Sequence, residues 1–149
     1  MRAVIQRVNS ASVYADGALS GEIGKGFYIL LGVGEGDTRL DAELLAAKIS
    51  KLRIFSDENG KMNLALGDVG GEVMAVSNFT LLANYSHGNR PDYLSAAKPD
   101  VAKELYLYFV ELLKGKGFTV ATGVFGADMR TEMSTDGPVT IVMDSAVLK

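Results

Sequence analysis

The stretch Ser12-Val13-Tyr14-Ala15-Asp16-Gly17-Ala18-Leu19-Ser20-Gly21-Glu22-Ile23 decides the fold class. Its centre, Asp16-Gly17, is a dipeptide that tolerates positive φ and is typical of tight two-residue hairpins. We therefore expect antiparallel strands on either side of it, the second running from Ala18 to Ile23. Outward from this hairpin, Val4 to Val8 is further strand material. The almost unbroken apolar run from Phe27 to Val33 predicts a strand buried on both faces.

Two later segments have helical periodicity. The first begins at Thr38-x-x-Asp41, which resembles a capping box, and its apolar stripe consists of Leu45, Ile49 and Leu52. The second is expected from about Asp100 to Lys114, with Pro99 at its start. Further strands are expected at Glu72 to Ser77, Phe118 to Thr122 and Val139 to Asp144. Because the hairpin requires antiparallel pairing, the pattern predicts an α/β (α+β) fold: a single domain, residues 1–149, with a mixed, largely antiparallel sheet and two main helices.

Composition excludes several kinds of chemistry. The chain has 149 residues, no Cys and a single His, so it offers no thiolate nucleophile, no zinc–thiolate site and no multi-histidine metal site. We expect no metal and no cofactor. A formal net charge of -3 argues against non-specific binding to a polyanion but leaves room for a local basic patch. Charge near the N-terminus and the lack of a long apolar run predict a cytoplasmic protein without a membrane partner.

The first candidate site is Ser77-Asn78-Phe79-Thr80-Leu81, which places three polar side chains directly after an apolar strand. The residues alone leave open that these hydroxyls simply bond the neighbouring backbone at a strand edge. Thr80 is a weak nucleophile candidate, because no base is evident near it in the sequence.

The second candidate is Ser134-Thr135-Asp136-Gly137-Pro138-Val139-Thr140, interpreted as a turn before the last strand. Only about 5 to 6% of X-Pro bonds in folded proteins are cis, so the residues alone favour a trans bond. His87 lies in a long polar loop from Leu82 to Pro99 and is given no base role. The acidic run Asp57-Glu58-Asn59-Gly60 fits a solvated turn better than a calcium loop.

Together with Met1 to Val8, Leu52-Arg53-Ile54-Phe55, Gly60-Lys61-Met62-Asn63 and Phe125-Gly126-Ala127-Asp128-Met129, these two segments closely resemble the D-aminoacyl-tRNA deacylases. The resemblance spans essentially the whole chain, with the markers in the family's order. In that family the two motifs usually read Ser-Gln-x-Thr-Leu and Asn-x-Gly-Pro-x-Thr. This chain departs at two positions, with Asn78 in place of Gln and Thr135 in place of Asn.

The resemblance implies a homodimeric hydrolase that cleaves the ester between a D-amino acid, or glycine, and the 3′-terminal adenosine of tRNA. It implies a cis Gly137-Pro138 bond that each subunit inserts into its partner's site. The two carbonyls would hold the substrate's α-amino group and exclude an L side chain by steric clash. The resemblance also implies that Arg7 holds the Gly137-Pro138 dipeptide in place. Ser77, Asn78, Phe79 and Thr80 form the catalytic segment, while Phe125 and Met129 pack against the adenine.

Two mechanisms fit this resemblance. Either Thr80 attacks the ester to form an acyl-enzyme, or backbone donors act while the ribose 2′-hydroxyl helps to activate water. We prefer the second because the sequence offers no base for Thr80. Phosphate contacts are expected to be few, with candidates Arg2, Arg53, Lys61 and Lys98. The alternative functions are a non-catalytic RNA-binding module and a small esterase or amidase acting on free metabolites.

Overall fold

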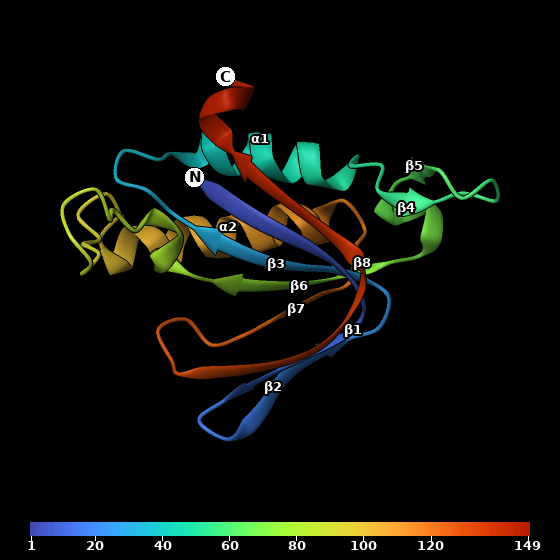
Figure 1. The fold of residues 1–149 in the computed structure, drawn as a ribbon, viewed down its shortest axis with the longest axis horizontal. Coiled ribbons are helices and arrows are strands. Elements are labelled where there is room, and N and C mark those ends of the chain that lie inside the picture. Colours follow the sequence, from blue (N-terminus) through green and yellow to red (C-terminus); the bar gives the residue numbers. More distant parts are fainter.

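A computed structural model describes residues 1–149 and contains one strongly bent six-stranded sheet (Figure 1). The strands of this sheet are β1 (Arg2–Ala15), β2 (Ala18–Ile23), β3 (Gly26–Gly32), β6 (Glu72–Ser77), β7 (Val120–Thr122) and β8 (Met129–Asp144). Strand β1 pairs antiparallel with β2, β3 and β8, whereas β3 with β6 and β6 with β7 are parallel. The mixed, largely antiparallel sheet is confirmed.

The two longest strands were underestimated from the sequence. Strand β1 runs without interruption from Arg2 to Ala15, although two shorter segments were expected. Strand β8 begins at Met129 instead of Val139, because the long β1 gives it an edge to pair with along its whole length. The register between them shifts on both sides of Val8, and irregularities of this kind bend strands. Asp136-Gly137-Pro138 lies inside β8 at this bend, so the predicted turn before the last strand is wrong.

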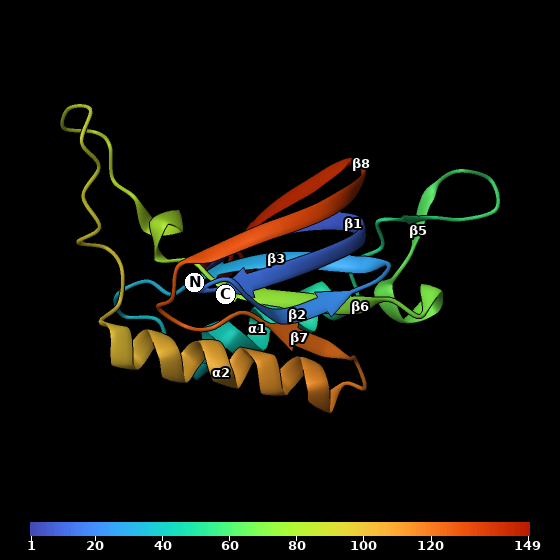
Figure 2. The same cartoon turned by 90° about the horizontal axis from the view of Figure 1, so that it is seen from below.

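The two main helices, α1 (Arg39–Ser50) and α2 (Pro99–Gly115), cover one face of the sheet (Figure 2). The capping box predicted for α1 is present in part, since the Asp41 carboxylate accepts a hydrogen bond from the Thr38 N–H at 2.8 Å. Helix α2 agrees with its expected bounds to within one residue. The main hydrophobic core, which includes Phe27, Phe55 and Phe109, lies between these helices and the sheet.

The other half of the sheet curls until β2 and β7 nearly meet. The Ser20 hydroxyl donates to the Thr122 carbonyl at 2.8 Å, and a Cβ on Gly21 would lie 3.0 Å from the same oxygen. This near-barrel encloses a second, smaller core, which consists of Val8, Ala11, Val13, Ile23, Tyr28, Met74 and Val76. Strand β7 starts at Val120 instead of the expected Phe118.

The remaining elements are short. A two-stranded hairpin is formed by β4 (Phe55–Ser56) and β5 (Met62–Leu64), and single 3₁₀ turns span Leu66–Val69, Phe79–Leu82 and Ser145–Leu148. None of the helices combines the length and the apolar character that crossing a membrane requires.

Candidate active site

A largely apolar cavity of about 710 Å³ opens where β6 ends and β8 begins, beside the start of α2. Five of the residues predicted for the site line it: Ser77, Asn78, Phe79, Phe125 and Met129. Residues far apart in the sequence meet here because the parallel pairing of β3 with β6 aligns their ends, while the curl of the sheet brings β8 alongside. The size and apolar lining suit a small organic group with a few polar contacts.

Asn78 organises the turn that follows β6. It is the N-cap of the Phe79–Leu82 turn, and its side-chain oxygen accepts hydrogen bonds from the Thr80 N–H at 3.2 Å and from the Thr80 hydroxyl at 2.5 Å. The backbone N–H of Asn78 donates to the Leu31 carbonyl at 2.8 Å, which ties the turn to β3. The shorter Asn side chain therefore has a local role in this chain.

The capped turn determines what Thr80 can do. Its side chain is exposed and does not line the cavity, and its hydroxyl donates to an amide oxygen, which does not act as a base. The Phe79 N–H is the first amide of this 3₁₀ turn. The first amides of a helix have no hydrogen-bond acceptor within the helix. Phe79 itself lines the cavity, so this donor belongs to the segment at the cavity wall.

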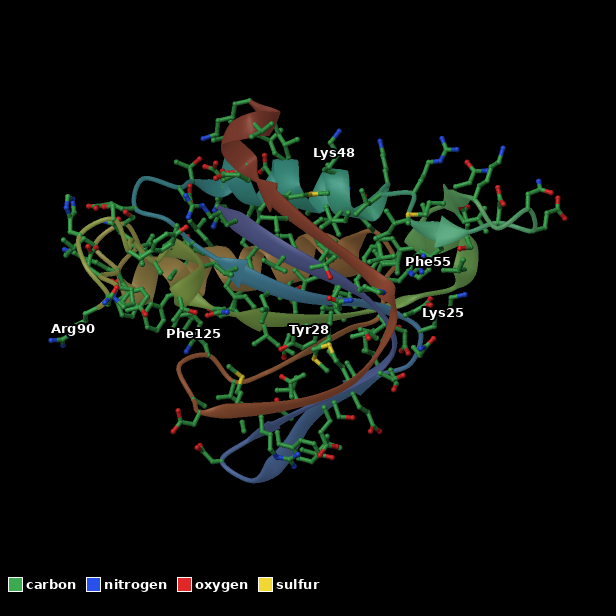
Figure 3. The ribbon with its side chains drawn as sticks, in the orientation of Figure 1. Lys25, Tyr28, Lys48, Phe55, Arg90 and Phe125 are labelled. Atoms are coloured by element: carbon green, nitrogen blue, oxygen red, sulfur yellow. The ribbon has the colours of Figure 1, made fainter.

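Aromatic side chains form part of the cavity lining. Phe79, 55% exposed, packs edge-on against Tyr93, with ring centroids 5.0 Å apart. The ring of Phe125, which lines the cavity, lies against Tyr106, with ring centroids 6.1 Å apart. Figure 3 shows where Phe125 lies in the molecule. Sequence reasoning missed Tyr93, although a loop as long as the one from Leu82 to Pro99 that carries it is more often functional than idle in a small domain.

Tyr28 is a second cavity residue that the sequence reasoning missed. Its hydroxyl lies 2.9 Å from the Thr131 hydroxyl, and burial raises the pKa of the phenol although this hydrogen bond opposes the shift. A tyrosine inside an apolar strand needs a polar partner, and that need was the available signal. Asp128 also lines the cavity.

The other predicted residues lie elsewhere. Arg7 is buried, and its Nε donates to the Asp136 carbonyl at 3.0 Å and lies 3.2 Å from that residue's carboxylate. Its Nη1 donates to the Ile54 carbonyl at 2.6 Å. Arg7 thus ties the segment just before Gly137-Pro138 to Ile54, while neither Gly137 nor Pro138 lines the cavity.

The Gly137-Pro138 bond is cis, as the family resemblance implies and against the expectation from the residues alone. Gly137 has a φ of 146°, which L side chains rarely adopt, and a Cβ there would lie 2.3 Å from the Val139 nitrogen. Both residues are exposed. Figure 3 shows that Phe55, the neighbour of Ile54, and Phe125 lie at opposite ends of the molecule. One chain therefore keeps its Gly-Pro segment away from its own cavity.

Comparison with known proteins decides the family. The model of a family described as D-Tyr-tRNA(Tyr) deacylase matches residues 4–144, from near the start of β1 to the end of β8. The chain belongs to this family. A D-aminoacyl-tRNA deacylase from Koribacter versatilis is 54% identical over 145 residues, and one from Anaeromyxobacter dehalogenans is 53% identical over 145 residues. Each alignment covers 97% of both chains.

Solved structures agree with the family fold. A structure titled c-Myc DNA Unwinding Element Binding Protein matches with a TM-score of 0.90 and 38% identity, covering 97% of this chain and 98% of the other. A probable eukaryotic D-amino acid tRNA deacylase matches with a TM-score of 0.79 at 14% identity, covering 96% and 98%, and shows the fold alone. The near-barrel with two helices on one face is thus a fold that solved structures also have.

Proposed function

We propose that this protein hydrolyses the ester that joins a D-amino acid, or glycine, to the 3′-terminal adenosine of tRNA, as a cytoplasmic enzyme without metal or cofactor. The observation that carries this proposal is the cavity itself. In a member of the deacylase family, it brings Ser77, Asn78 and Phe79 together with Phe125 and Met129.

The apolar wall is suited to the terminal adenine. An unpaired base stacks on aromatic or polarizable side chains whatever its identity, because every base has a flat π face. Phe125 and Met129 supply such groups at one side of the cavity, and the exposed ring of Phe79 supplies another at its mouth. The side chain of the amino acid is then recognised weakly, and the enzyme tolerates many D-amino acids.

The chemistry relies on the backbone and on the substrate. We assign to the Phe79 N–H the stabilisation of the oxyanion that develops on the ester carbonyl. Thr80 lacks a base, since its hydroxyl donates to the Asn78 amide oxygen. We therefore assign activation of the attacking water to the ribose 2′-hydroxyl and give Thr80 a supporting role in the turn. The absence of Cys and the single His are compatible with such a mechanism.

The Gly137-Pro138 segment acts on the cavity of a second copy. It is exposed and remote from its own cavity, so a homodimer is needed to bring its carbonyls to the substrate's α-amino group. Strand β8 pairs only with β1 and exposes Val142, with 72% of its surface accessible, and Met133. An edge strand with exposed apolar side chains is a suitable surface for packing against another chain. In the dimer, the Gly-Pro segment leaves no room for an L side chain.

The test of this proposal is a deacylation assay that compares a D-aminoacyl-tRNA, the matching glycyl-tRNA and the free ester of the same D-amino acid. Turnover of both tRNA substrates, with a much lower kcat/KM for the free ester, is expected, because binding of the terminal adenosine contributes at the transition state. Binding of aminoacyl-tRNA without turnover indicates the RNA-binding module. Equal hydrolysis of the free ester indicates the metabolite esterase.

A further inference from the structure

A group of unpaired positive charges lies at the end of the molecule that carries Gly137-Pro138. The Lys and Arg side chains that pair with a carboxylate within the chain are Arg2, Arg7, Arg39, Lys114, Arg130 and Lys149. Nine Lys and Arg side chains remain. Four of them form an exposed group around the start of the β4–β5 hairpin, which we call the basic end and which consists of Lys25, Lys51, Arg53 and Lys61.

Named contacts place the basic end beside the Gly-Pro segment. The hydrogen bond from Arg7 to the Ile54 carbonyl links that segment to the residue after Arg53. Lys25 lies over the ring of Phe55, with its Nζ 5.6 Å from the centroid, and Figure 3 shows both residues at the end opposite Phe125. Within one chain, the basic end is therefore remote from the cavity.

The carboxylates nearby leave these charges available. The side chain of Asp57 accepts the N–H groups of Asn59 and Lys61 in its own turn, at 2.9 and 3.0 Å. One carboxylate oxygen of Glu72 accepts the Gly24 N–H at 2.9 Å. Glu58 is exposed at the hairpin turn, and no ion pair joins it to the basic end.

Arg53 stabilises the hairpin that displays this charge. Its Nε donates to the Asn63 carbonyl at 2.7 Å, and its guanidinium also donates to the Asn63 side chain. These contacts join the segment that leads into β4 to β5. Lys51 and Lys61 have no such structural role, so they can be changed without removing a contact that holds the fold.

We propose that the basic end of one subunit binds the acceptor-stem phosphates of the tRNA whose 3′ end enters the partner's cavity. This inference rests on the proposed function, since it takes the Gly-Pro segment as entering that cavity. The same insertion brings the basic end to the rim of the partner's cavity, where the strand leading to the bound adenosine must pass. Each active site then combines the cavity of one subunit with the phosphate-binding basic end of the other.

The first test compares two double variants of equal charge. Lys51→Gln/Lys61→Gln is expected to raise KM for D-aminoacyl-tRNA about 10-fold at low salt. The slope of log KM against the logarithm of the salt concentration is expected to fall by about 1 to 2, because two phosphate contacts are lost. The control, Arg39→Gln/Lys103→Gln, loses two exposed charges, one from α1 and one from α2, and is expected to change KM little. An equal effect of both variants would contradict the proposal.

A truncated substrate separates this inference from the proposed function. D-Aminoacyl-adenosine has no stem phosphates, so Lys51→Gln/Lys61→Gln is expected to hydrolyse it at the parental rate. An equal loss on this substrate overturns the basic-end inference while leaving the deacylase function standing. Failure of the parent protein to hydrolyse either substrate overturns the function itself.

Mixed dimers test whether the contact crosses between subunits. Asn78→Ala/Phe79→Ala inactivates a cavity, and two affinity tags allow dimers of defined composition to be purified. When the cavity and charge substitutions are on different subunits, the intact cavity faces an intact basic end and normal KM is expected. When both sets are on one subunit, the intact cavity faces a depleted basic end and KM rises. The reverse result would place the contact within one chain and refute the proposal.

Discussion

Replacing Arg7 by Met removes the donor that holds the Gly137-Pro138 segment while keeping most of the apolar stem. The buried guanidinium donates to the carbonyls of Asp136 and Ile54 at 3.0 and 2.6 Å. A buried acceptor left without its donor costs about 1–3 kcal/mol, so two cost roughly 2–6 kcal/mol. The ion pair with Asp136 adds little, because that carboxylate is 38% exposed and screened by solvent.

A loss of about 3 kcal/mol lowers Tm by roughly 6–12 °C for a chain of about this size. The assay is thermal unfolding of Arg7→Met and the parent at one protein concentration, since assembly makes Tm depend on concentration. Arg2→Met is the control, because that guanidinium is 45% exposed and donates to Asp144 and to the Leu81 carbonyl at the surface. A fall of no more than about 4 °C is expected there.

The same Arg7 variant is expected to lose deacylation activity by at least about 10-fold at a temperature where it is folded, because the segment that contacts the substrate loses its position. A variant that melts within about 2 °C of the parent and keeps the parental kcat/KM would show that Arg7 does not brace this segment.

Three further substitutions test other parts of the structure. Thr80→Val is expected to keep kcat within about 10-fold of the parent, and an acyl-enzyme trapped in the parent would contradict this. Gly26→Ala places a Cβ 1.8 Å from the Glu72 carbonyl oxygen and is expected to abolish folding in a solubility assay, whereas Gly115→Ala meets nothing within 4 Å and should be tolerated. Burial opposes ionisation of Asp41, but hydrogen bonds from Lys149, Ser145 and Thr38 lower its pKa below the ordinary value. The stabilisation that ionised Asp41 gives the fold is therefore complete above about pH 4 and is lost as the pH falls further. In urea unfolding, the free energy of unfolding of Asp41→Asn should be lower than that of the parent at pH 7, and this difference should shrink below pH 4.

Local signals predicted most of the fold. The Ala18–Ile23 strand and the helix after Thr38 follow from turn chemistry and capping, which act over a few residues. The first half of β8 was missed because its exposed, polar residues have no apolar run, and only pairing with β1 fixes them as a strand. Their alternation, from half-buried Met129 to exposed Arg130, was the signal that could have revealed it.

The site was predictable in parts but not as an arrangement. Ser77-Asn78 stood out as polar residues after an apolar strand, and the structure shows why: Asn78 caps the next turn. No spacing rule indicates that Phe125 joins this turn or that Gly137-Pro138 lies at the opposite end. Both depend on the curl of the sheet, which arises from pairings between residues more than a hundred positions apart, such as Val8 with Thr135.

The central claim is that this protein removes D-amino acids, and not L-amino acids, from tRNA. Single-turnover hydrolysis of one tRNA charged with the D or the L form of the same amino acid tests it most directly. We predict a D-to-L rate ratio of at least about 100 for the parent and a much smaller ratio for Pro138→Ala, through faster hydrolysis of the L form. Comparable rates on the two forms by the parent protein, or an unchanged ratio after the Pro138 substitution, would contradict the account.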